Sequence, residues 1–290
     1  MSFNKRLSSG DFVVLAHMNT PKGVNISEMV INARRIKERV HGVVIPDMDN
    51  GVMRMSAIGG AVLMRQQGLE PVIHVYGRDR NRMAIQGDVL AAHVLGIENL
   101  VVVKGENMAS GDHVDARPVD DLDEIAILKA IKSLESGRDM AGFELDGSPS
   151  FTLGCTLGPF VDDQSLAQEI DRVKRKIEAG AQFVITPYIF DMNRLVELVR
   201  KIKELGVFVL STVFLLKTVS IARYIATYEP GAFIKEDLIK RMRQSKDRET
   251  EGFIIAGEMI KGLRGIADGV QIVTLGWEHR LPSILDYADL

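Results

Sequence analysis

The stretch PVIHVYGRDRNRMAIQGDVLAAHVLG, residues 71–96, joins two patterns that together decide the fold. Its first part, 71–76, is an apolar run rich in β-branched residues, which is typical of a strand buried on both faces. A glycine and a charged turn follow, and an amphipathic segment of helical spacing comes next. The stretch therefore predicts a strand, a turn and a helix, with one histidine, His74, inside the strand.

The same pattern recurs along the chain, because short apolar runs alternate with amphipathic segments. Eight runs are expected to be strands, namely 12–18, 42–47, 71–76, 99–106, 151–158, 183–191, 207–214 and 269–276. Eight such repeats in 290 residues predict an α/β protein with the (β/α)8 TIM barrel fold, as a single domain over residues 1–290. A doubly wound open sheet is the alternative, but it normally uses fewer strands, and no GxGxxG turn follows the first run.

The composition is the ordinary mix of a globular protein with a sizeable core, since 46% of the residues are hydrophobic and 26% are charged. The net charge of −3 gives no basic surface, so we expect no nucleic-acid partner and no membrane partner. The first residues lack the apolar segment of a signal peptide. The single cysteine, Cys155, excludes a disulfide framework, so we expect a cytoplasmic protein whose buried thiol is inert.

Polar residues stand where several of the predicted strands end, which is where barrel enzymes hold their functional groups. These residues are His17, Asp47, His74, Lys104, Gly105, Glu106, Thr186 and Tyr188. The long polar segment 107–120 follows the fourth strand and is expected at the same end. Taken singly, each residue could be a plain turn or packing residue, but their convergence at one end of a barrel predicts a functional site.

Cationic side chains near the same end indicate an anionic ligand, because guanidinium and ammonium groups bind phosphate. Arg78, Arg80 and Lys104 follow neighbouring strands, and the basic segment 172–176 is expected at the start of the helix after the fifth strand. For 172–176 a solvated helix face is the simpler interpretation on spacing alone. No histidines and carboxylates have the spacing of metal ligands, so no metal site is expected.

Several long segments resemble the methylenetetrahydrofolate reductase family. They are AHMNTPKG (16–23), RDRNRMAIQGDVLAAHVLGIENLVVVKGE (78–106), VKRKIEAGAQFVITPYIFD (173–191) and most of 229–276. The resemblance runs nearly end to end. It implies a barrel flavoprotein that holds FAD at the C-terminal face of the strands and passes a hydride from a nicotinamide, NAD(P)H, through the flavin to methylene-tetrahydrofolate.

The resemblance also implies roles for individual residues. The expected FAD-binding residues are His74, Arg78, Asp79, Asn81, Lys104, Gly105, Arg172, Arg175 and Lys176. Asp47, Thr186 and Tyr188 are the candidates for binding the pterin.

The chain departs from the family mainly on the substrate side. His17 stands where the family has its catalytic glutamate, and Glu106 stands where it has an aspartate near the flavin. An unperturbed imidazole has a pKa of about 6.5, which suits proton transfer at neutral pH. The resemblance therefore implies that His17 and Glu106 are the catalytic residues. Pro187 replaces the glutamine that contacts folate, and Val219 replaces the aromatic that packs on it. Another side chain must therefore hydrogen-bond the pterin.

The sequence predicts a flavin-dependent oxidoreductase of one-carbon metabolism that reduces a methylene-pterin, methylene-tetrahydrofolate or a relative, to its methyl form. One alternative is a non-redox paralogue that transfers a methyl group between tetrahydrofolate or another pterin and a corrinoid protein. Another is a flavin-holding subunit of a larger complex with a partner redox protein. We also expect a homo-oligomer.

Overall fold

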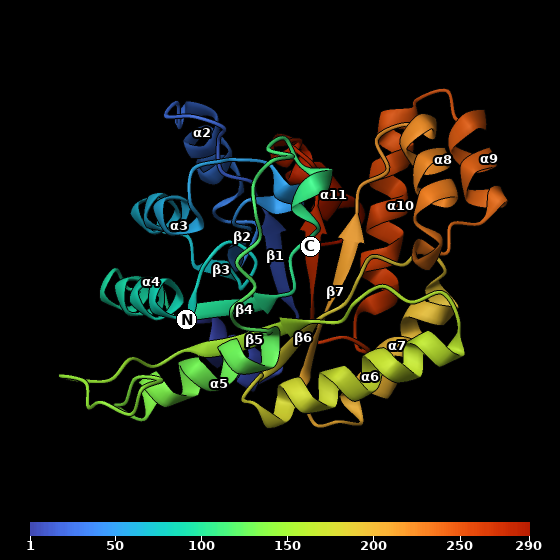
Figure 1. The fold of residues 1–290 in the computed structure, drawn as a ribbon. Coiled ribbons are helices and arrows are strands. Elements are labelled where there is room, and N and C mark those ends of the chain that lie inside the picture. Colours follow the sequence, from blue (N-terminus) through green and yellow to red (C-terminus); the bar gives the residue numbers. More distant parts are fainter.

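The computed structural model describes all residues, 1–290, as one closed barrel of eight parallel strands (Figure 1). The strands are β1 (Val13–His17), β2 (Gly42–Ile45), β3 (Pro71–Tyr76), β4 (Asn99–Val103), β5 (Thr152–Thr156), β6 (Phe183–Ile185), β7 (Phe208–Phe214) and β8 (Gly269–Val273). β1 pairs with β8, from Val13 opposite Gly269 to His17 opposite Val273, and this pairing closes the barrel. The predicted (β/α)8 TIM barrel is confirmed, and the open sheet is excluded.

Helices surround the barrel and bury apolar stripes against the strands (Figure 1). They are α2 (Ser27–Ile36), α3 (Ala57–Gln66), α4 (Arg82–Val94), α5 (Glu124–Glu135), α6 (Asp163–Glu178), α7 (Met192–Lys203), α8 (Val219–Tyr228), α9 (Glu236–Gln244), α10 (Arg248–Leu263) and α11 (Leu281–Tyr287). Four short 3-10 turns, η1 (Asp49–Gly51), η2 (Met108–Ser110), η3 (Pro230–Ala232) and η4 (Glu278–Arg280), lie in the connections. None of the helices has both the length and the apolar character that a membrane crossing requires.

An N-terminal helix that the sequence patterns did not reveal, α1 (Phe3–Ser9), closes one end of the barrel. Its buried residues Phe3 and Leu7 belong to a cluster with residues from six strands: Val13, Leu15, Val44, Val72, Val101, Phe183, Ile185 and Leu210. The ring of Phe3 meets the ring of Phe183 edge-on, with centroids 5.1 Å apart. Gly154 of β5 leaves the space that Phe183 fills, because a Cβ at this position would overlap the Phe183 ring.

The barrel interior changes from apolar to polar toward the C-terminal ends of the strands. Side chains alternate along a strand, so Leu15 and His17 of β1 face the same way, with His17 nearer the strand end. Gln271 of β8 lies opposite Thr212 of β7 in the strand register. Polar groups from separate strands thus gather above an apolar floor. Cys155 is buried in β5, and burial raises the pKa of its thiol to about 12, in agreement with the expected inert thiol.

Candidate functional site

A cavity of about 630 Å³ opens at the C-terminal ends of the strands. It is the place where the barrel brings together the polar residues that follow separate strands. Seven of the predicted site residues line it, namely His17, His74, Lys104, Gly105, Glu106, Thr186 and Tyr188. Asp49, Thr212, Phe214, Tyr224 and Gln271 line it as well.

Two imidazoles, His17 from β1 and His74 from β3, meet in this cavity with ring centroids 6.3 Å apart. Nδ1 of His74 lies 3.1 Å from the hydroxyl of Tyr76, while its Nε2 is buried without a partner. Burial disfavours the imidazolium form, so it lowers the pKa of His17 to about 4 and the pKa of His74 to about 3. Both rings are therefore neutral at pH 7, and His17 does not have the ordinary pKa that the sequence-based hypothesis assumed.

Two carboxyl groups, Asp49 and Glu106, line the same cavity. Burial is the main cause that raises the pKa of each, and the negative charge of Asp49 raises the pKa of Glu106 further. These groups therefore keep their protons to a higher pH than exposed carboxyls do. Asp49 was missed in the sequence, although it stands only two residues after Asp47 in the segment that follows β2.

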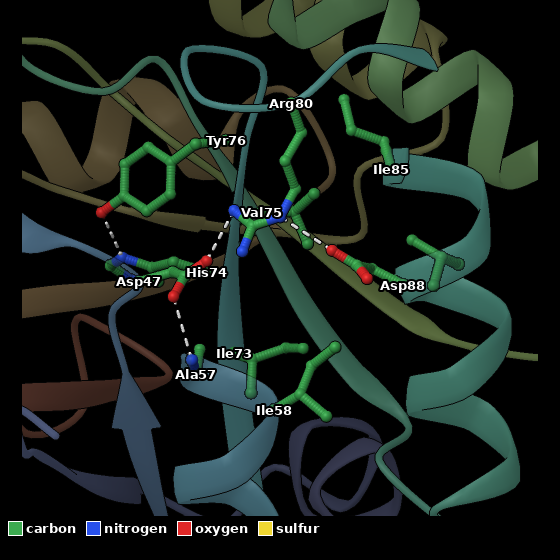
Figure 2. Close-up of a pocket in the computed structure, with 11 residues that line it drawn as sticks. Asp47, Ala57, Ile58, Ile73, His74, Val75, Tyr76, Arg80, Ile85 and Asp88 are labelled. Carbon is green, nitrogen blue, oxygen red and sulfur yellow. Dashed lines mark hydrogen bonds and ion pairs between the residues drawn. The ribbon is translucent and has the colours of Figure 1, made fainter. Parts of the chain in front are cut away.

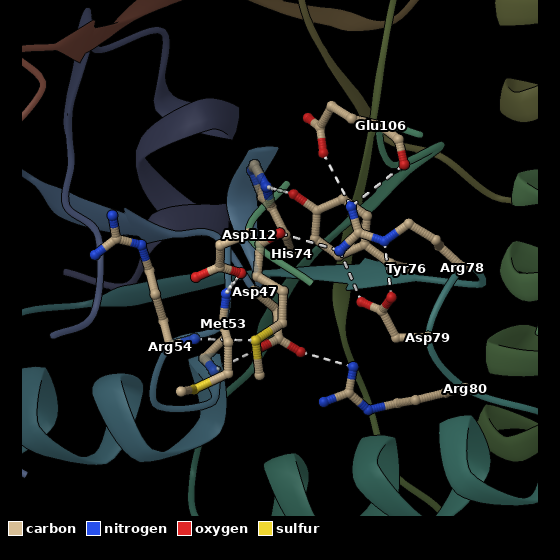
Figure 3. Close-up of polar contacts among 12 residues, drawn as sticks. Asp47, Met53, Arg54, His74, Tyr76, Arg78, Asp79, Arg80, Glu106 and Asp112 are labelled. Carbon is tan, nitrogen blue, oxygen red and sulfur yellow. Dashed lines mark hydrogen bonds and ion pairs between the residues drawn. The ribbon is translucent and has the colours of Figure 1, made fainter. Parts of the chain in front are cut away.

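Arg78 is buried, with 3% of its surface exposed, and protein groups occupy all three of its side-chain nitrogens (Figure 3). Nε and Nη2 donate to the carboxylate of Asp79, Nη2 also donates to the carbonyl of Met48 at 3.0 Å, and Nη1 donates to Glu106 at 3.1 Å. The guanidinium also lies 5.1 Å from the centre of the Tyr76 ring. Arg78 therefore holds Glu106 and the turn after β2 in place, and it has no free donor for a phosphate.

Asp47, predicted to bind the pterin, does not line the 630 Å³ cavity. Figure 2 shows it in a small pocket beside β3, together with Ala57 and Arg80. Its Oδ1 accepts a hydrogen bond from the backbone N–H of Ala57 at the start of α3, at 3.0 Å, and its Oδ2 pairs with Arg80 at 2.7 Å. Arg80 pairs in turn with Asp88 of α4. Asp47 lines a cavity of about 30 Å³ beside β3, which has room for roughly one water molecule. In this structure Asp47 links α3 to the turn after β3.

A second cavity, of about 650 Å³, adjoins the first and shares the segment Val103, Lys104, Gly105 and Glu106 with it. Residues of the 107–120 segment and the start of α5 complete its wall, so that segment does lie at the C-terminal end of the barrel. Lys104 is exposed and takes part in no ion pair, so its ammonium is free to bind an anion. Four carboxylates also line this cavity: Glu106, Asp120, Asp123 and Glu124.

The remaining predicted cofactor residues line neither large cavity. Asn81 caps α4 by accepting hydrogen bonds from the N–H groups of Met83 and Ala84. The expectation that 172–176 begins a helix was wrong, because α6 begins at Asp163 behind the N-cap residue Asp162 and the basic segment lies in its second half. A capping box at Asp162 and Ser165 fixes this earlier start.

The three predicted cations of α6 are engaged with protein groups. Arg172 pairs with Glu169, and Arg175 pairs with Asp171, and both arginine side chains are about half exposed. Lys176 is buried, pairs with Glu124 and donates to the carbonyl of Thr156 at 2.9 Å. Their predicted contacts with FAD stay predictions.

The substrate-side residues Thr186 and Tyr188 line the first cavity. Thr186 is tied to the neighbouring strand, because its carbonyl accepts a hydrogen bond of 2.6 Å from the hydroxyl of Thr212. Tyr188 packs its ring 4.8 Å from that of Phe214, and its hydroxyl contacts the carboxyl of Glu229, whose pKa is raised by burial. Tyr188 therefore forms part of a fixed wall.

Besides Asp49, Gln271 and Tyr224 line the cavity and were missed by sequence reasoning. Gln271 is 6% exposed, and its amide oxygen has no partner. Its signal was a single amide side chain within the apolar run 269–273. Tyr224 is 58% exposed and shares one face of α8 with Ile221 and Ile225, which also line the cavity. The spacing of Tyr224 and Ile225, three and four residues after Ile221, could have indicated that the three side chains share one helix face.

A family model described as methylenetetrahydrofolate reductase matches residues 2–289. A search of curated proteins found no match. Among solved structures, the chain is similar to an uncharacterized protein from Clostridium thermocellum that binds two copies of 5-methyl-5,6,7,8-tetrahydrofolic acid, with 15% identity, a TM-score of 0.67, and coverage of 100% of this chain and 98% of that chain.

Two enzymes have a related fold. An F420-dependent secondary alcohol dehydrogenase, solved with an F420-acetone adduct, is 9% identical with a TM-score of 0.59 and coverage of 95% of this chain and 98% of that chain. EDTA monooxygenase from Chelativorans sp. BNC1 is 10% identical with a TM-score of 0.56 and coverage of 96% and 94%. At such identities these likenesses show the barrel fold alone. The family model, in contrast, spans nearly the whole sequence, and this chain belongs to the methylenetetrahydrofolate reductase family.

Proposed function

We propose that this protein binds a reduced folate in the cavity at the barrel mouth and reduces its one-carbon group from methylene to methyl with bound FAD. Family membership supports a folate-related function. A protein of the same fold that binds 5-methyl-tetrahydrofolate supports the same class of ligand. The observation that carries the proposal is the 630 Å³ cavity, which brings Glu106 and Asp49 together with two neutral imidazoles.

The shape of the site and its free cation fit a flavin dinucleotide. The two adjoining cavities meet at 103–106, so they suit an elongated ligand with a flat ring at one end. Gly105 has a φ of 77°, which favours glycine, and a Cβ there would lie 2.9 Å from the Tyr76 ring. Lys104 supplies the free positive charge for a diphosphate. Of the nearby carboxylates, Asp123 caps α5 and Glu124 pairs with Lys176, which reduces their repulsion of an anion.

The protein's own groups serve the proton transfer. Reduction of methylene-tetrahydrofolate breaks the bond between the one-carbon unit and one folate nitrogen, adds a proton to that nitrogen and adds a hydride to the carbon. Bound FAD, reduced by a nicotinamide, would supply the hydride. Glu106 is our candidate for the proton donor, because it faces the cavity, Arg78 fixes it and burial raises its pKa. His17, neutral at pH 7, would act as a hydrogen-bonding group beside the substrate.

The rim of the cavity suits the aromatic part of a folate. Tyr224 presents an exposed ring there, next to Ile221 and Ile225 on the same helix face. We propose that Tyr224 packs on the aminobenzoyl group, in the role that Val219 cannot fill. Aromatic pairs of this kind contribute about 0.5–1.5 kcal/mol beyond the area they bury.

The test is a visible absorption spectrum of the purified protein, followed by titration with 5-methyl-tetrahydrofolate and an assay of methylene-tetrahydrofolate reduction with NADH or NADPH. We expect a flavin spectrum that is bleached by the nicotinamide and restored by methylene-tetrahydrofolate, which takes up the hydride. A protein that binds the folate but neither retains nor takes up FAD would refute the reductase assignment. A protein that binds neither ligand would refute the proposed function as a whole.

A further inference from the structure

Two polar atoms deep in the 630 Å³ cavity lack hydrogen-bond partners. Six buried side-chain atoms of the chain have none, and of the residues that carry them only His74 and Gln271 line this cavity. The unpartnered atoms are Nε2 of His74 and Oε1 of Gln271. Folded proteins leave few buried polar atoms without a partner, so two such atoms in one cavity point to a surface that is available for hydrogen bonds to a ligand.

The surroundings of Gln271 do not offer it a partner. Its neighbour in the strand register, Thr212, already donates its hydroxyl hydrogen to the carbonyl of Thr186 at 2.6 Å. Leu15, on the other neighbouring strand, is apolar and fully buried. Nδ1 of His74 is engaged by the hydroxyl of Tyr76, so only its Nε2 is left for a ligand.

A glutamine side chain has a specific chemical complement. Its amide oxygen accepts one hydrogen bond while its amide nitrogen donates another alongside. The matching edge is a lactam, in which a ring N–H stands next to a ring carbonyl. Both a reduced pterin and an isoalloxazine ring carry such an edge, and a neutral imidazole can add one further hydrogen bond.

We propose that Gln271 recognises the lactam edge of the ring that occupies the depth of this cavity, with Nε2 of His74 as the second contact. This inference rests on the proposed function and deepens it, because it names the residue that hydrogen-bonds to the ring and recognises it. Gln271 would thereby supply a hydrogen-bonding amide from β8 that the chain lacks at Pro187, after β6. Occupation of the site would satisfy both unpaired atoms at once.

The experiment compares wild type with Gln271→Met, which has a similar size but cannot form these hydrogen bonds, and with Gln244→Met on the exposed end of α9 as the matched control. FAD and 5-methyl-tetrahydrofolate are titrated separately into each full-length protein. We expect Gln271→Met to weaken one of the two ligands about tenfold, the effect of losing a hydrogen bond or two, while Gln244→Met changes neither. The ligand that is weakened identifies the ring bound in the depth of the cavity.

A second measurement separates recognition from a packing defect. The same ring methylated at the lactam nitrogen cannot donate to Gln271, so wild type should bind it about tenfold more weakly, and Gln271→Met should not distinguish the two forms. Unchanged affinity of Gln271→Met for both parent ligands would overturn the assignment while leaving the proposed function intact. Failure of the wild type to bind either ligand would instead refute the proposed function.

Discussion

The guanidinium of Arg78 binds the carboxylate of its neighbour Asp79 through two parallel contacts, Nε to Oδ1 at 2.8 Å and Nη2 to Oδ2 at 2.7 Å. This bidentate geometry is the strongest that the two groups can form. The remaining donors reach the carbonyl of Met48 and the side chain of Glu106. One buried cation thus joins the turn after β2 and the ends of β3 and β4, and it sets the position of the proposed proton donor.

Replacing Arg78 by methionine should destabilise the protein by about 3–5 kcal/mol, because Asp79 and Glu106 would lose the partner of their charges in a partly buried site. Urea unfolding followed by circular dichroism measures the change. The matched control is Arg82→Met, which removes an exposed pair with Asp121 and should cost much less than the loss of Arg78, because solvent screens an exposed ion pair. Equal costs for the two variants would contradict the assigned role of Arg78.

Replacing Glu106 by glutamine should slow methylene-tetrahydrofolate reduction about 100-fold, since the amide keeps the shape of the side chain but has no acidic proton to give. Binding of 5-methyl-tetrahydrofolate should change little. Asp115→Asn, at an exposed position of the 107–120 segment, is the control and should leave the rate unchanged. If Glu106→Gln retains the full rate, the proton comes from another group, and Asp49→Asn becomes the next variant to assay.

The stability of the protein should fall on mild acidification because of His17. Its pKa is about 4 in the folded state against a model value of 6.5, so the unfolded chain takes up the proton first as the pH falls. The stabilisation is fully present above pH 6.5 and is lost progressively as the pH falls toward about 4. The shift corresponds to about 3 kcal/mol, at ~1.4 kcal/mol per pKa unit.

Urea unfolding of wild type and His17→Gln at several pH values across that window measures this contribution. The variant should lose about 3 kcal/mol less stability than wild type between neutral pH and pH ~4. His113→Gln, at an exposed site, is the control and should follow the wild-type curve. Parallel curves for His17→Gln and wild type would show that the buried imidazole does not titrate as described.

Truncating Phe3 to alanine should destabilise the barrel by about 3–5 kcal/mol, the usual cost of removing a buried aromatic ring. Phe3 is fully buried against Phe183, so its loss would leave a cavity at the closed end of the barrel. Thermal or urea unfolding measures the effect. Phe143→Ala, at a position that is 72% exposed, should change stability by less than about 0.5 kcal/mol.

Replacing Tyr224 by alanine should weaken binding of 5-methyl-tetrahydrofolate about 3- to 10-fold and leave FAD affinity unchanged, because the ring lies at the rim of the cavity and contributes only its packing. Fluorescence or calorimetric titration measures both affinities. Tyr287→Ala on α11 removes a comparably exposed ring that lines neither large cavity and should leave both affinities as in wild type. An unchanged folate affinity in Tyr224→Ala would remove this residue from the site.

The barrel could be predicted from the sequence because its strands are continuous apolar runs of regular spacing, a local property. Helix α1 could not be predicted in the same way, because only Phe3 and Leu7 of its seven residues are buried. Its other residues are polar or charged and give no helical pattern of apolar positions. The positions of His17 and His74 near one another followed from the fold. Their lowered pKa values did not, because burial depends on neighbours far away in the chain.

The predicted cations show the same limit. Arg78 and Lys104 look alike in sequence as basic residues after neighbouring strands, yet one is saturated by Asp79, Glu106 and Met48 and the other is free. Gln271 was passed over because one polar residue in an apolar run is a weak signal that does not indicate a role. Its lack of a partner becomes visible only when the adjacent strands are in place.

Helix α1 covers the barrel end that lies opposite the 630 Å³ cavity, and an apolar cluster fills the barrel beneath it. A ligand bound in the depth of the cavity must bind before a second ligand that packs above it. It can dissociate only after the second ligand has left. A ring held in the depth of the cavity would therefore exchange slowly whenever another ligand fills the space above it.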